Sequence, residues 1–368
     1  MKKPQIQSQK LPLALSFDDV LLVPQYSEIN SRSEVDLHTK LSPNLTLEIP
    51  LISTNMSTVT GVEMAVKMAE LGGMGILPRF EPIEIQANKV AQVRTRVGDR
   101  VADEKNQKPI AASIGLKEEL RRAETLVNAG ATVINVDVAH GHMKQNLDFI
   151  KRVKSHFGDK ITIIGGIAST AECAKDLYKA GADSVFIGIG GGSICTTRIM
   201  TGCGLPTMDS VFRIGEVARR LGKSCIPGAG IRNSGDIVKA LAGGASAIAG
   251  GNIFAGTDET PGEIIEINGK KYKKYEGSTS IEEKKRHIEA NPEGKSASYT
   301  KHIEGVAGLI EYKGPLNEIV ENLLAGVRSG FAYCGARNLT ELWEKAEFVQ
   351  ISAGGIRESH SHDILEIE

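Results

Sequence analysis

Eight short apolar segments recur along the chain, each rich in Val, Ile and Ala and each ending in Gly, Ser, Asp or Asn. They are residues 49–54, 73–77, 109–115, 132–138, 161–166, 183–190, 224–230 and 245–251. Longer amphipathic stretches, such as 116–130 and 170–181, separate them. Continuous apolar strands that alternate with helices are typical of a parallel sheet covered by helices. Eight consecutive strand–helix units therefore predict the α/β class and a closed (β/α)8 TIM barrel.

One long segment, about 257–312, breaks this alternation after the eighth strand. It has no convincing buried run and is dense in Lys, Glu, Ser and Gly. Within it, INGKKYKKY predicts a short hairpin that turns at Asn268–Gly269, and the remainder, 276–305, predicts a mobile segment. Structureless segments of this length are usually lids or linkers, so we expect a mobile flap. The pattern over 314–335 then predicts a final helix.

Composition excludes several classes of protein. The formal charge of −1 leaves no electrostatic basis for nucleic-acid binding, and 41% hydrophobic residues exclude a disordered chain. No signal-peptide run and no stretch of transmembrane length is present, so we expect no membrane partner and a soluble, cytoplasmic protein. The 5 cysteines form no CxxC, which argues against a zinc site or a disulfide framework. The 40 glycines mark backbone positions that need positive φ or close approach.

The most informative candidate for chemistry is GIGGGSICTTR, residues 188–198, which follows the sixth strand. In such barrels the active site lies at the carboxyl ends of the strands. The glycines of this loop offer amides to an anion or carbonyls to a cation. Cys195 is a candidate nucleophile, because exposed amide dipoles lower the pKa of a thiol. The alternative is a small buried hydrophobic residue, which is the interpretation we favour for the other cysteines.

Two further loops, 228–236 and 250–257, follow the seventh and eighth strands, where barrels often hold a phosphate. Gly230 is predicted to open a helix and Gly251–Asn252 to form a tight turn, and both offer amides to a phosphate. Ordinary connecting turns are the alternative. Asp137, at the end of the fourth strand, is placed to accept hydrogen bonds from ribose hydroxyls.

At GIGGGSICTTR the chain closely resembles the IMP dehydrogenase/GMP reductase family, and the resemblance covers almost the whole chain. LSFDDVLLVPQYSEI, IPLISTNMSTVT, ELGGMGILPRF, NVDVAHGH, AGTDETPGE and GGIRESHSHDI have family counterparts in the same order. The regulatory CBS insertion of many members is absent. The resemblance therefore implies one catalytic domain over 1–368, and the family is usually a homotetramer.

The resemblance implies an NAD(P)-dependent oxidoreductase that acts at C2 of a purine nucleoside monophosphate. Cys195 matches the residue that attacks C2. In the dehydrogenase direction, hydride passes to NAD and a covalent intermediate is hydrolysed, converting IMP to XMP for GMP biosynthesis. In the reductase direction, GMP loses ammonia and receives hydride from NADPH. Thr197 and Glu304 match a Thr–Glu pair that relays a proton from water or ammonia.

The resemblance also assigns the binding positions. Those for the substrate are Ser193, Gly228, Gly230, Gly251, Asn252, Tyr275 and Gly277. Those for the NAD or NADP cofactor are Asp137, Val138, Gly188 and Gly190. The carbonyls of Gly190, Gly192 and Cys195 match a loop that holds a monovalent cation, K⁺, with residues 357–363 of a neighbouring subunit contributing.

Some differences between this chain and the family concern the direction of the reaction. Dehydrogenases carry an Arg–Tyr pair in the flap that activates water, and here Arg286–His287 and Lys301–His302 are imperfect replacements. Thr201 resembles the reductase, whereas the flap length and the tail resemble the dehydrogenase. We favour the dehydrogenase, since Thr197 and Glu304 can activate water without the arginine. GMP reductase, a related enzyme for a modified purine nucleotide and a non-catalytic nucleotide sensor are the alternatives.

Other departures concern the sugar pocket. The family's Asp after the seventh strand is Gly228 here, its Asn after the fifth strand is Gly166, and the Asp of its MDTV motif is Ser57. Phe186 replaces a basic residue before the Cys loop. Losing groups that hold ribose hydroxyls weakens nucleotide binding by about 1–3 kcal/mol each. The alternative hypothesis is a ligand whose sugar is modified, deoxygenated or bulkier at this place.

Overall fold

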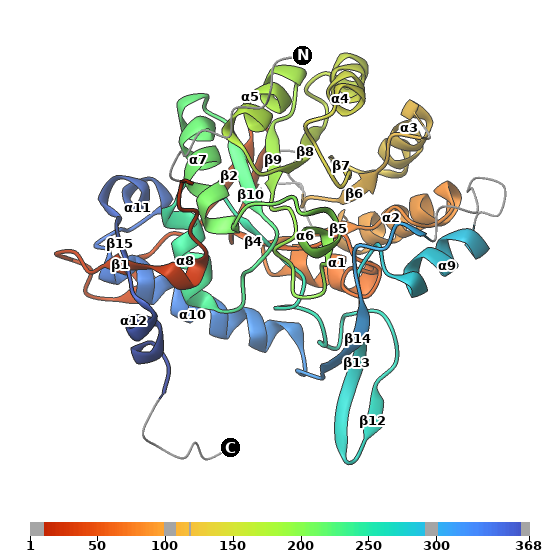
Figure 1. The fold of residues 1–368 in the computed structure, drawn as a ribbon. Coiled ribbons are helices and arrows are strands. Elements are labelled where there is room, and N and C mark those ends of the chain that lie inside the picture. Colours follow the sequence, from red (N-terminus) through yellow and green to blue (C-terminus); the bar gives the residue numbers. More distant parts are fainter. Residues whose placement is uncertain (1–10, 99–107, 118, 291–300, 362–368) are drawn as a thin grey trace, which may run out of the picture.

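The computed structural model describes residues 11–98, 108–117, 119–290 and 301–361 (Figure 1). Eight parallel strands form one sheet in the order β10-β9-β8-β7-β6-β5-β4-β11. They are β4 (Leu51–Ser53), β5 (Met74–Leu77), β6 (Ala111–Ile114), β7 (Val133–Val136), β8 (Thr162–Ala168), β9 (Ser184–Ile187), β10 (Ser224–Pro227) and β11 (Ile248–Gly250). Between the outermost strands, the amide of Ser246 donates to the carbonyl of Cys225 at 2.9 Å, which closes the barrel. All eight predicted strands and the predicted TIM barrel are confirmed.

Helices surround the strands on the outside of the barrel (Figure 1). They are α1 (Val62–Glu70), α2 (Ile83–Gly98), α3 (Glu119–Ala129), α4 (Lys144–Phe157), α5 (Ala171–Ala180), α7 (Thr207–Arg220), α8 (Ser234–Ala242) and α10 (Leu316–Tyr333). The short α6 (Thr197–Thr201) instead lies at the carboxyl ends of the strands, where Thr197 lines the cavity. The α5 helix shows how local sequence sets these bounds. The Thr170 side chain caps its first turn, and Gly181, with φ of 114°, ends it. The helices predicted within 116–130 and 170–181 are confirmed.

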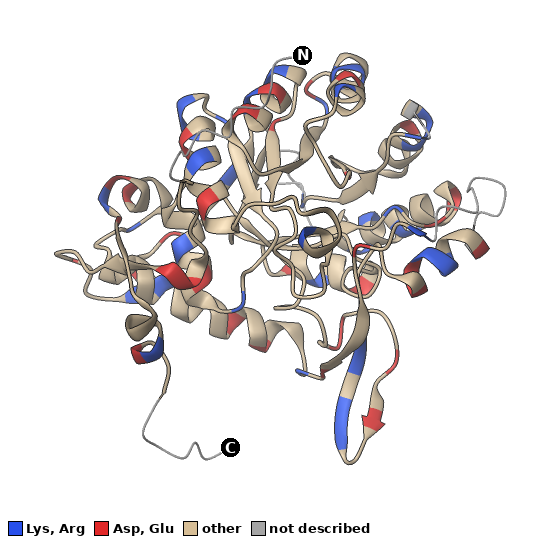
Figure 2. Ribbon diagram, in the orientation of Figure 1, with Lys and Arg blue, Asp and Glu red and all other residues tan. Residues whose placement is uncertain are grey.

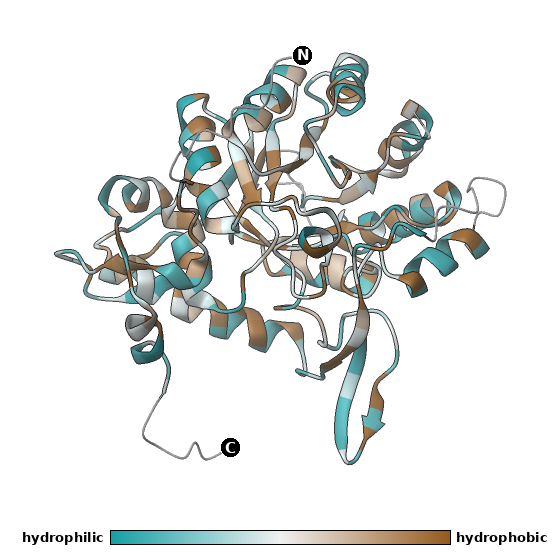
Figure 3. Cartoon of the chain, in the orientation of Figure 1, coloured by the Kyte–Doolittle hydropathy of each residue, from teal (hydrophilic) through white to brown (hydrophobic). Residues whose placement is uncertain are grey.

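The interior of the barrel is sealed at the amino-terminal ends of its strands by a hairpin that the sequence pattern did not reveal. This hairpin consists of β2 (Thr39–Ser42) and β3 (Leu45–Leu47). Its leucines join the buried cluster inside the barrel, and the Ser224 hydroxyl at the start of β10 donates to the carbonyl of Leu41 at 2.6 Å. Figure 3 shows the hydrophobic strands inside a ring of helices with hydrophilic outer faces. Because one end is closed, the cavity of the barrel opens only toward the carboxyl ends of the strands.

The segment 257–312 contains more regular structure than expected. Strands β12 (Ile265–Ile267), β13 (Lys270–Glu276) and β14 (Ala307–Glu311) form an antiparallel sheet that projects from the barrel (Figure 1). The predicted turn is confirmed, since Asn268 and Gly269 have φ of 52° and 77°. Figure 2 shows the row of lysines along β13. The prediction of a structureless remainder is wrong for 281–290, which form α9 (Ile281–Ala290). Residues 291–300 lie outside the described residues.

The chain ends differently from the prediction of a final helix over 314–335. That helix exists as α10, but α11 (Leu339–Lys345), β15 (Glu347–Gln350) and α12 (Ala353–Glu358) follow it. Strand β15 pairs antiparallel with β1 (Val20–Val23), joining the two ends of the chain beside the barrel. None of the helices in the described part of the chain combines the length and apolar character that crossing a bilayer requires.

Candidate functional site

A cavity of about 530 Å³ lies at the carboxyl ends of the barrel strands. Its wall includes every residue that the sequence analysis proposed for catalysis and binding. These are Asp137, Val138, Gly188, Gly190, Gly192, Ser193, Cys195, Thr197, Gly228, Gly230, Gly251, Asn252, Tyr275, Gly277 and Glu304. The barrel supplies most of them from the loops after its strands, while Tyr275, Gly277 and Glu304 come from the flap.

Cys195, Thr197 and Glu304 form a continuous hydrogen-bonded chain in this wall. The Sγ of Cys195 lies 3.2 Å from Oγ1 of Thr197, and Thr197 donates to Oε2 of Glu304 at 2.7 Å. Since the Thr197 hydroxyl hydrogen is directed at the carboxylate, its oxygen is the acceptor for the Cys195 thiol hydrogen. Backbone pairing holds the two segments together, because the amide of Thr196 donates to the carbonyl of Glu304 at 2.9 Å. The arrangement can move a proton from the cavity to a carboxylate.

The loop before Cys195 needs glycine for its shape. Gly188 and Gly190 have φ of 121° and 74°, where a side chain is strained. At Gly191 a Cβ would lie 2.7 Å from Oγ1 of Thr207. Arg198 stabilises the loop, since its Nε donates to the carbonyl of Ile189 at 3.1 Å. The glycines therefore let the backbone itself form the cavity wall.

Three of the predicted substrate positions, Ser193, Gly251 and Tyr275, lie together in the cavity wall. The Tyr275 hydroxyl is hydrogen-bonded to the Ser193 side chain, and burial raises the pKa of Tyr275. A Cβ at Gly251 would lie 2.9 Å from this hydroxyl. The tight turn at Gly251–Asn252 is confirmed by a bond from the Ala255 amide to the Gly251 carbonyl at 2.9 Å.

The prediction that Gly230 opens a helix is wrong. Gly230 lies in a loop with φ of 78°, and α8 begins only at Ser234, capped by the Asn233 side chain. A capping side chain at Asn233 favours helix initiation there, because it satisfies the amide of Asp236. Any amide that Gly230 offers to a phosphate is thus a loop amide rather than a helix terminus.

The opposite side of the cavity contains two residues that sequence reasoning missed. Arg79 donates from Nε to Oδ2 of Asp137 at 2.9 Å, and its guanidinium lies 4.0 Å from the ring centroid of Phe80. The ring of Phe80 stacks on His287 of α9, with centroids 4.0 Å apart. Both residues belong to the segment GMGILPRF directly after the second barrel strand, so their position at a strand end was the available signal.

The flap residues considered as water activators are bound elsewhere. Arg286 contacts Glu276 and Glu283, and buried His287 lies 2.9 Å from Oε1 of Glu283. Ser57 donates to Oε2 of Glu283 at 2.8 Å. Burial alone would raise the pKa of Glu283, but hydrogen bonds from His287, Arg286 and Ser57 outweigh it and lower that pKa to about 2. These contacts fasten α9 to the barrel and keep both residues out of the cavity wall.

The remaining cysteines follow the expectation of small buried residues with one exception. Cys173, Cys225 and Cys334 are buried, and burial raises the pKa of Cys173 and of Cys225 to about 12. Cys203 is exposed, so the expectation is wrong there. It follows α6 in a surface turn, where no apolar neighbour covers it.

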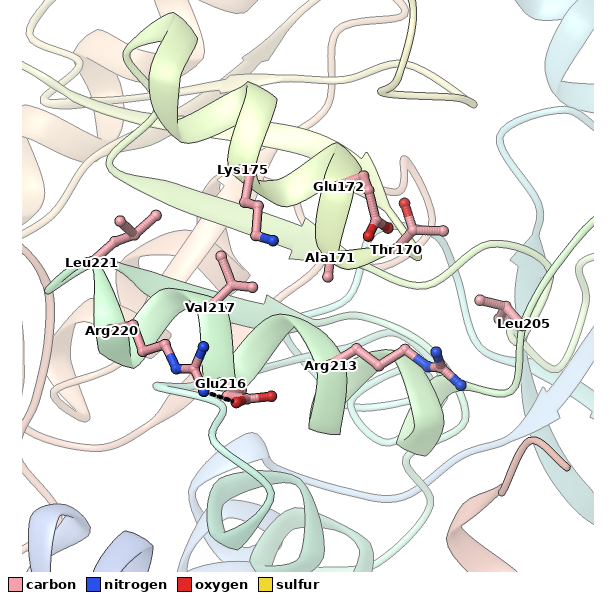
Figure 4. A pocket seen from close by; sticks show the side chains of 10 residues that line it. All are labelled: Thr170, Ala171, Glu172, Lys175, Leu205, Arg213, Glu216, Val217, Arg220 and Leu221. Carbon is pink, nitrogen blue, oxygen red and sulfur yellow. Dashed lines mark hydrogen bonds and ion pairs between the residues drawn. The ribbon is translucent and has the colours of Figure 1, made fainter. Parts of the chain in front are cut away.

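A second cavity, of about 380 Å³, lies between α5 and α7 (Figure 4). Its two arginines have acidic neighbours. Arg213 donates to Asp209 at 2.6 Å, and Arg220 pairs with Glu216. It contains no cysteine and lies away from the strand ends, so we do not consider it a candidate for catalysis. Within the described ranges, no group of three or more His, Cys, Asp and Glu side chains is arranged to hold a metal ion.

Comparison with known proteins gives consistent results. The family model for the IMP dehydrogenase/GMP reductase domain matches residues 14–362. The chain is 40% identical to inosine-5′-monophosphate dehydrogenase of Cryptosporidium parvum, covering 95% of both chains. It is 33% identical to the enzyme of that name from Nitrosopumilus maritimus, over 95% of this chain and 98% of the relative. Among solved structures, a GMP reductase variant from Trypanosoma brucei in complex with guanosine 5′-monophosphate has a TM-score of 0.88 and 30% identity, over 97% and 99% of the two chains.

Proposed function

The chain belongs to the IMP dehydrogenase/GMP reductase family of oxidoreductases, and we propose that it oxidises a purine nucleoside monophosphate at C2 through a covalent intermediate on Cys195. The observation that carries this proposal is the hydrogen-bonded chain from Cys195 through Thr197 to Glu304 in the wall of the large cavity. Ser193, Gly230 and the Gly251 turn form the phosphate end. A nucleotide held there extends its base toward Cys195.

The reaction follows from these positions. The Cys195 thiol loses its proton to solvent, and the sulfur adds to C2 of the purine while the C2=N3 electron pair moves to N3. The C2–H bond then breaks with loss of hydride, leaving the base joined to sulfur. Water adds to C2 while Thr197 and Glu304 accept its proton. The C–S bond breaks, the sulfur leaves as a thiolate, and the oxidised nucleotide is released. With IMP as substrate the product is XMP.

A nicotinamide cofactor, when bound, accepts the hydride. The residues on the side of Asp137 fit such a group, because the cavity wall there combines a carboxylate with the planar ring of Phe80. Asp137 would accept hydrogen bonds from the ribose hydroxyls, and Val138, Gly188 and Gly190 would line the nicotinamide side. We propose NAD for the dehydrogenase direction.

The cation and the oligomer are further parts of this proposal. We expect the carbonyls of Gly190, Gly192 and Cys195 to face K⁺. The Gly192 carbonyl already accepts a hydrogen bond from the Cys195 amide at 3.1 Å, so any cation shares it. Within residues 357–363, only 357–361 are described, and these belong to α12 and the turn after it. A homotetramer is expected, since the cation loop would then gain ligands from a neighbour.

GMP reduction with NADPH is the second candidate. The observation that favours it is the binding of Arg286 by Glu276 and Glu283, which leaves hydrolysis dependent on Thr197 and Glu304 alone. Reduction needs no activated water, because ammonia leaves from C2 and its proton can come from the same pair.

An ultraviolet assay distinguishes these candidates. NADH formation with IMP supports the dehydrogenase, and NADPH consumption with GMP supports the reductase. Mass spectrometry of the protein after incubation with IMP and NAD should show a nucleotide adduct on Cys195. The Cys195→Ala variant should lose both signals, while Cys203→Ala, a matched change of an exposed thiol, should keep them. Normal turnover by Cys195→Ala would refute the proposal, and binding without turnover or adduct would indicate a nucleotide sensor.

A further inference from the structure

The part of the cavity wall between the phosphate end and Cys195 is unusually apolar. Gly228 stands two residues before Gly230 on the same loop, and both line the cavity. A nucleotide with its phosphate at Gly230 would therefore have its sugar near Gly228. Beside Gly228 the wall continues with the ring of Phe186 and the methyl of Ala229. This stretch offers hydrocarbon and backbone to the sugar.

The apolar surface results from close packing between Phe186 on β9 and Gly228, which follows the neighbouring strand β10. Phe186 lies on β9 and points into the barrel, whereas Val185 and Ile187 point outward to the helices. Its ring covers Gly228, where a Cβ would lie 2.7 Å from Cζ and still closer to Cε1. A Cβ at Gly166 would lie 3.2 Å from Cβ of Phe186. A side chain at position 228 therefore requires the ring of Phe186 to move from its present place.

Each charged side chain of the cavity wall has a partner within the protein. Asp137 is bound by Arg79 at 2.9 Å, and Glu304 accepts from Thr197. The second cation of the wall, Arg232, pairs with acidic residues of the N-terminal segment and of α8.

On the β4 side, the hydroxyls of Thr54 and Ser57 donate to other side chains. Thr54 and Asn55 are hydrogen-bonded to each other at 3.3 Å. Ser57 donates to Glu283 at 2.8 Å and lies outside this wall. Among the described residues, the carboxylates of this wall are Asp137 and Glu304, and each already accepts a hydrogen bond from another side chain of the protein.

We propose that the substrate is a purine 2′-deoxyribonucleoside monophosphate, an inference that rests on the proposed function. A ribose hydroxyl buried against the Phe186 ring and Gly228 loses its hydrogen bonds to water and gains none. A deoxyribose methylene packs against the same ring without that loss. An apolar pocket disfavours an added hydroxyl by roughly 10- to 100-fold, whereas a site with a partner for the hydroxyl rejects the deoxy analogue far more strongly. An apolar site therefore has the higher kcat/KM for the deoxynucleotide. A site with a partner for the hydroxyl has the higher kcat/KM for the ribonucleotide.

The test compares kcat/KM for IMP and 2′-deoxy-IMP with NAD, and for GMP and 2′-deoxy-GMP with NADPH. We expect the deoxy substrate to be preferred by about tenfold or more in the active pair. Equal rates, or a preference for the ribonucleotide, would overturn the inference while leaving the proposed function intact. Absence of both turnover and a Cys195 adduct with all four nucleotides would instead overturn the proposed function, and the inference with it.

Two variants test the steric argument. Phe186→Ala with Gly228→Asp opens the wall for a carboxylate, and the preference should move at least tenfold toward the ribonucleotide. The matched control Phe186→Leu keeps the wall apolar and should keep the deoxy preference. Circular dichroism melting checks that both variants fold, and the wild-type ratio decides the question if the double variant does not. A double variant that folds and keeps the deoxy preference would contradict the role of Phe186.

Discussion

Replacing Glu283 by Gln tests how the flap helix α9 is held against the barrel. The Glu283 side chain is 3% exposed and contacts Arg286, His287 and Ser57 at once. Its pKa is lowered from 4.5 to about 2 despite the opposing effect of burial. At roughly 1.4 kcal/mol per pKa unit, this depression corresponds to at most about 3 kcal/mol of stabilisation. The value is an upper one, because Arg286 is 45% exposed and solvent screens its charge.

The sign of the pH dependence follows from the direction of the shift. A carboxyl whose pKa is lower in the folded state stabilises it above pH 4.5, and this contribution disappears as the pH falls toward about 2. In Glu283→Gln the contribution is absent at every pH. We therefore expect the α9 docking free energy to fall by about 2–3 kcal/mol at pH 7, with little difference from wild type near pH 2.

Hydrogen exchange of the α9 amides measures this docking directly. If the α9 amides exchange only when the helix leaves the barrel, a loss of about 2–3 kcal/mol in docking free energy speeds their exchange by roughly 30- to 150-fold. Glu282→Gln is the matched control, since Glu282 precedes Glu283 on α9 and is exposed, and it should leave exchange unchanged. If Glu283→Gln changed exchange at pH 7 no more than Glu282→Gln does, the account of α9 docking would be wrong.

Three further predictions concern catalysis, stability and reactivity. Glu304→Gln should slow hydrolysis of the Cys195 adduct by roughly 10²- to 10⁴-fold. The first hydride transfer should persist and appear as a burst in stopped-flow absorbance, and loss of this burst would contradict the assigned role of Glu304. Lys273→Met should destabilise the protein by about 1–3 kcal/mol in urea unfolding, because the buried ammonium donates to three carbonyls, whereas exposed Lys270→Met should be neutral. Iodoacetamide should label Cys203 in the native protein and leave buried Cys225 unlabelled, as peptide mapping can check.

Much of the fold was predictable from the sequence because its signals are local. Barrel strands are buried on both faces, so each reads as a continuous apolar run, and the helices between them have an apolar stripe. The Cys loop was equally readable, since its glycines and Cys195 are contiguous. The helix α9 was missed for the opposite reason. Its buried face contains Glu283, Lys284 and His287, and a search for apolar positions does not detect a helix that docks through polar groups.

The candidate site shows the same division between local signals and tertiary contacts. The sequence by itself determined that Cys195 and two further glycine-rich loops stand at strand ends, and these do share one cavity. The family resemblance already paired Thr197 with Glu304, and the tertiary structure adds the bond of 2.7 Å between them. Only the tertiary structure decided that the ring of Phe186 fills the space beside Gly228. Such contacts join strands and segments far apart in the chain. They depend on side-chain volume and strand position, which no pattern of neighbouring residues encodes.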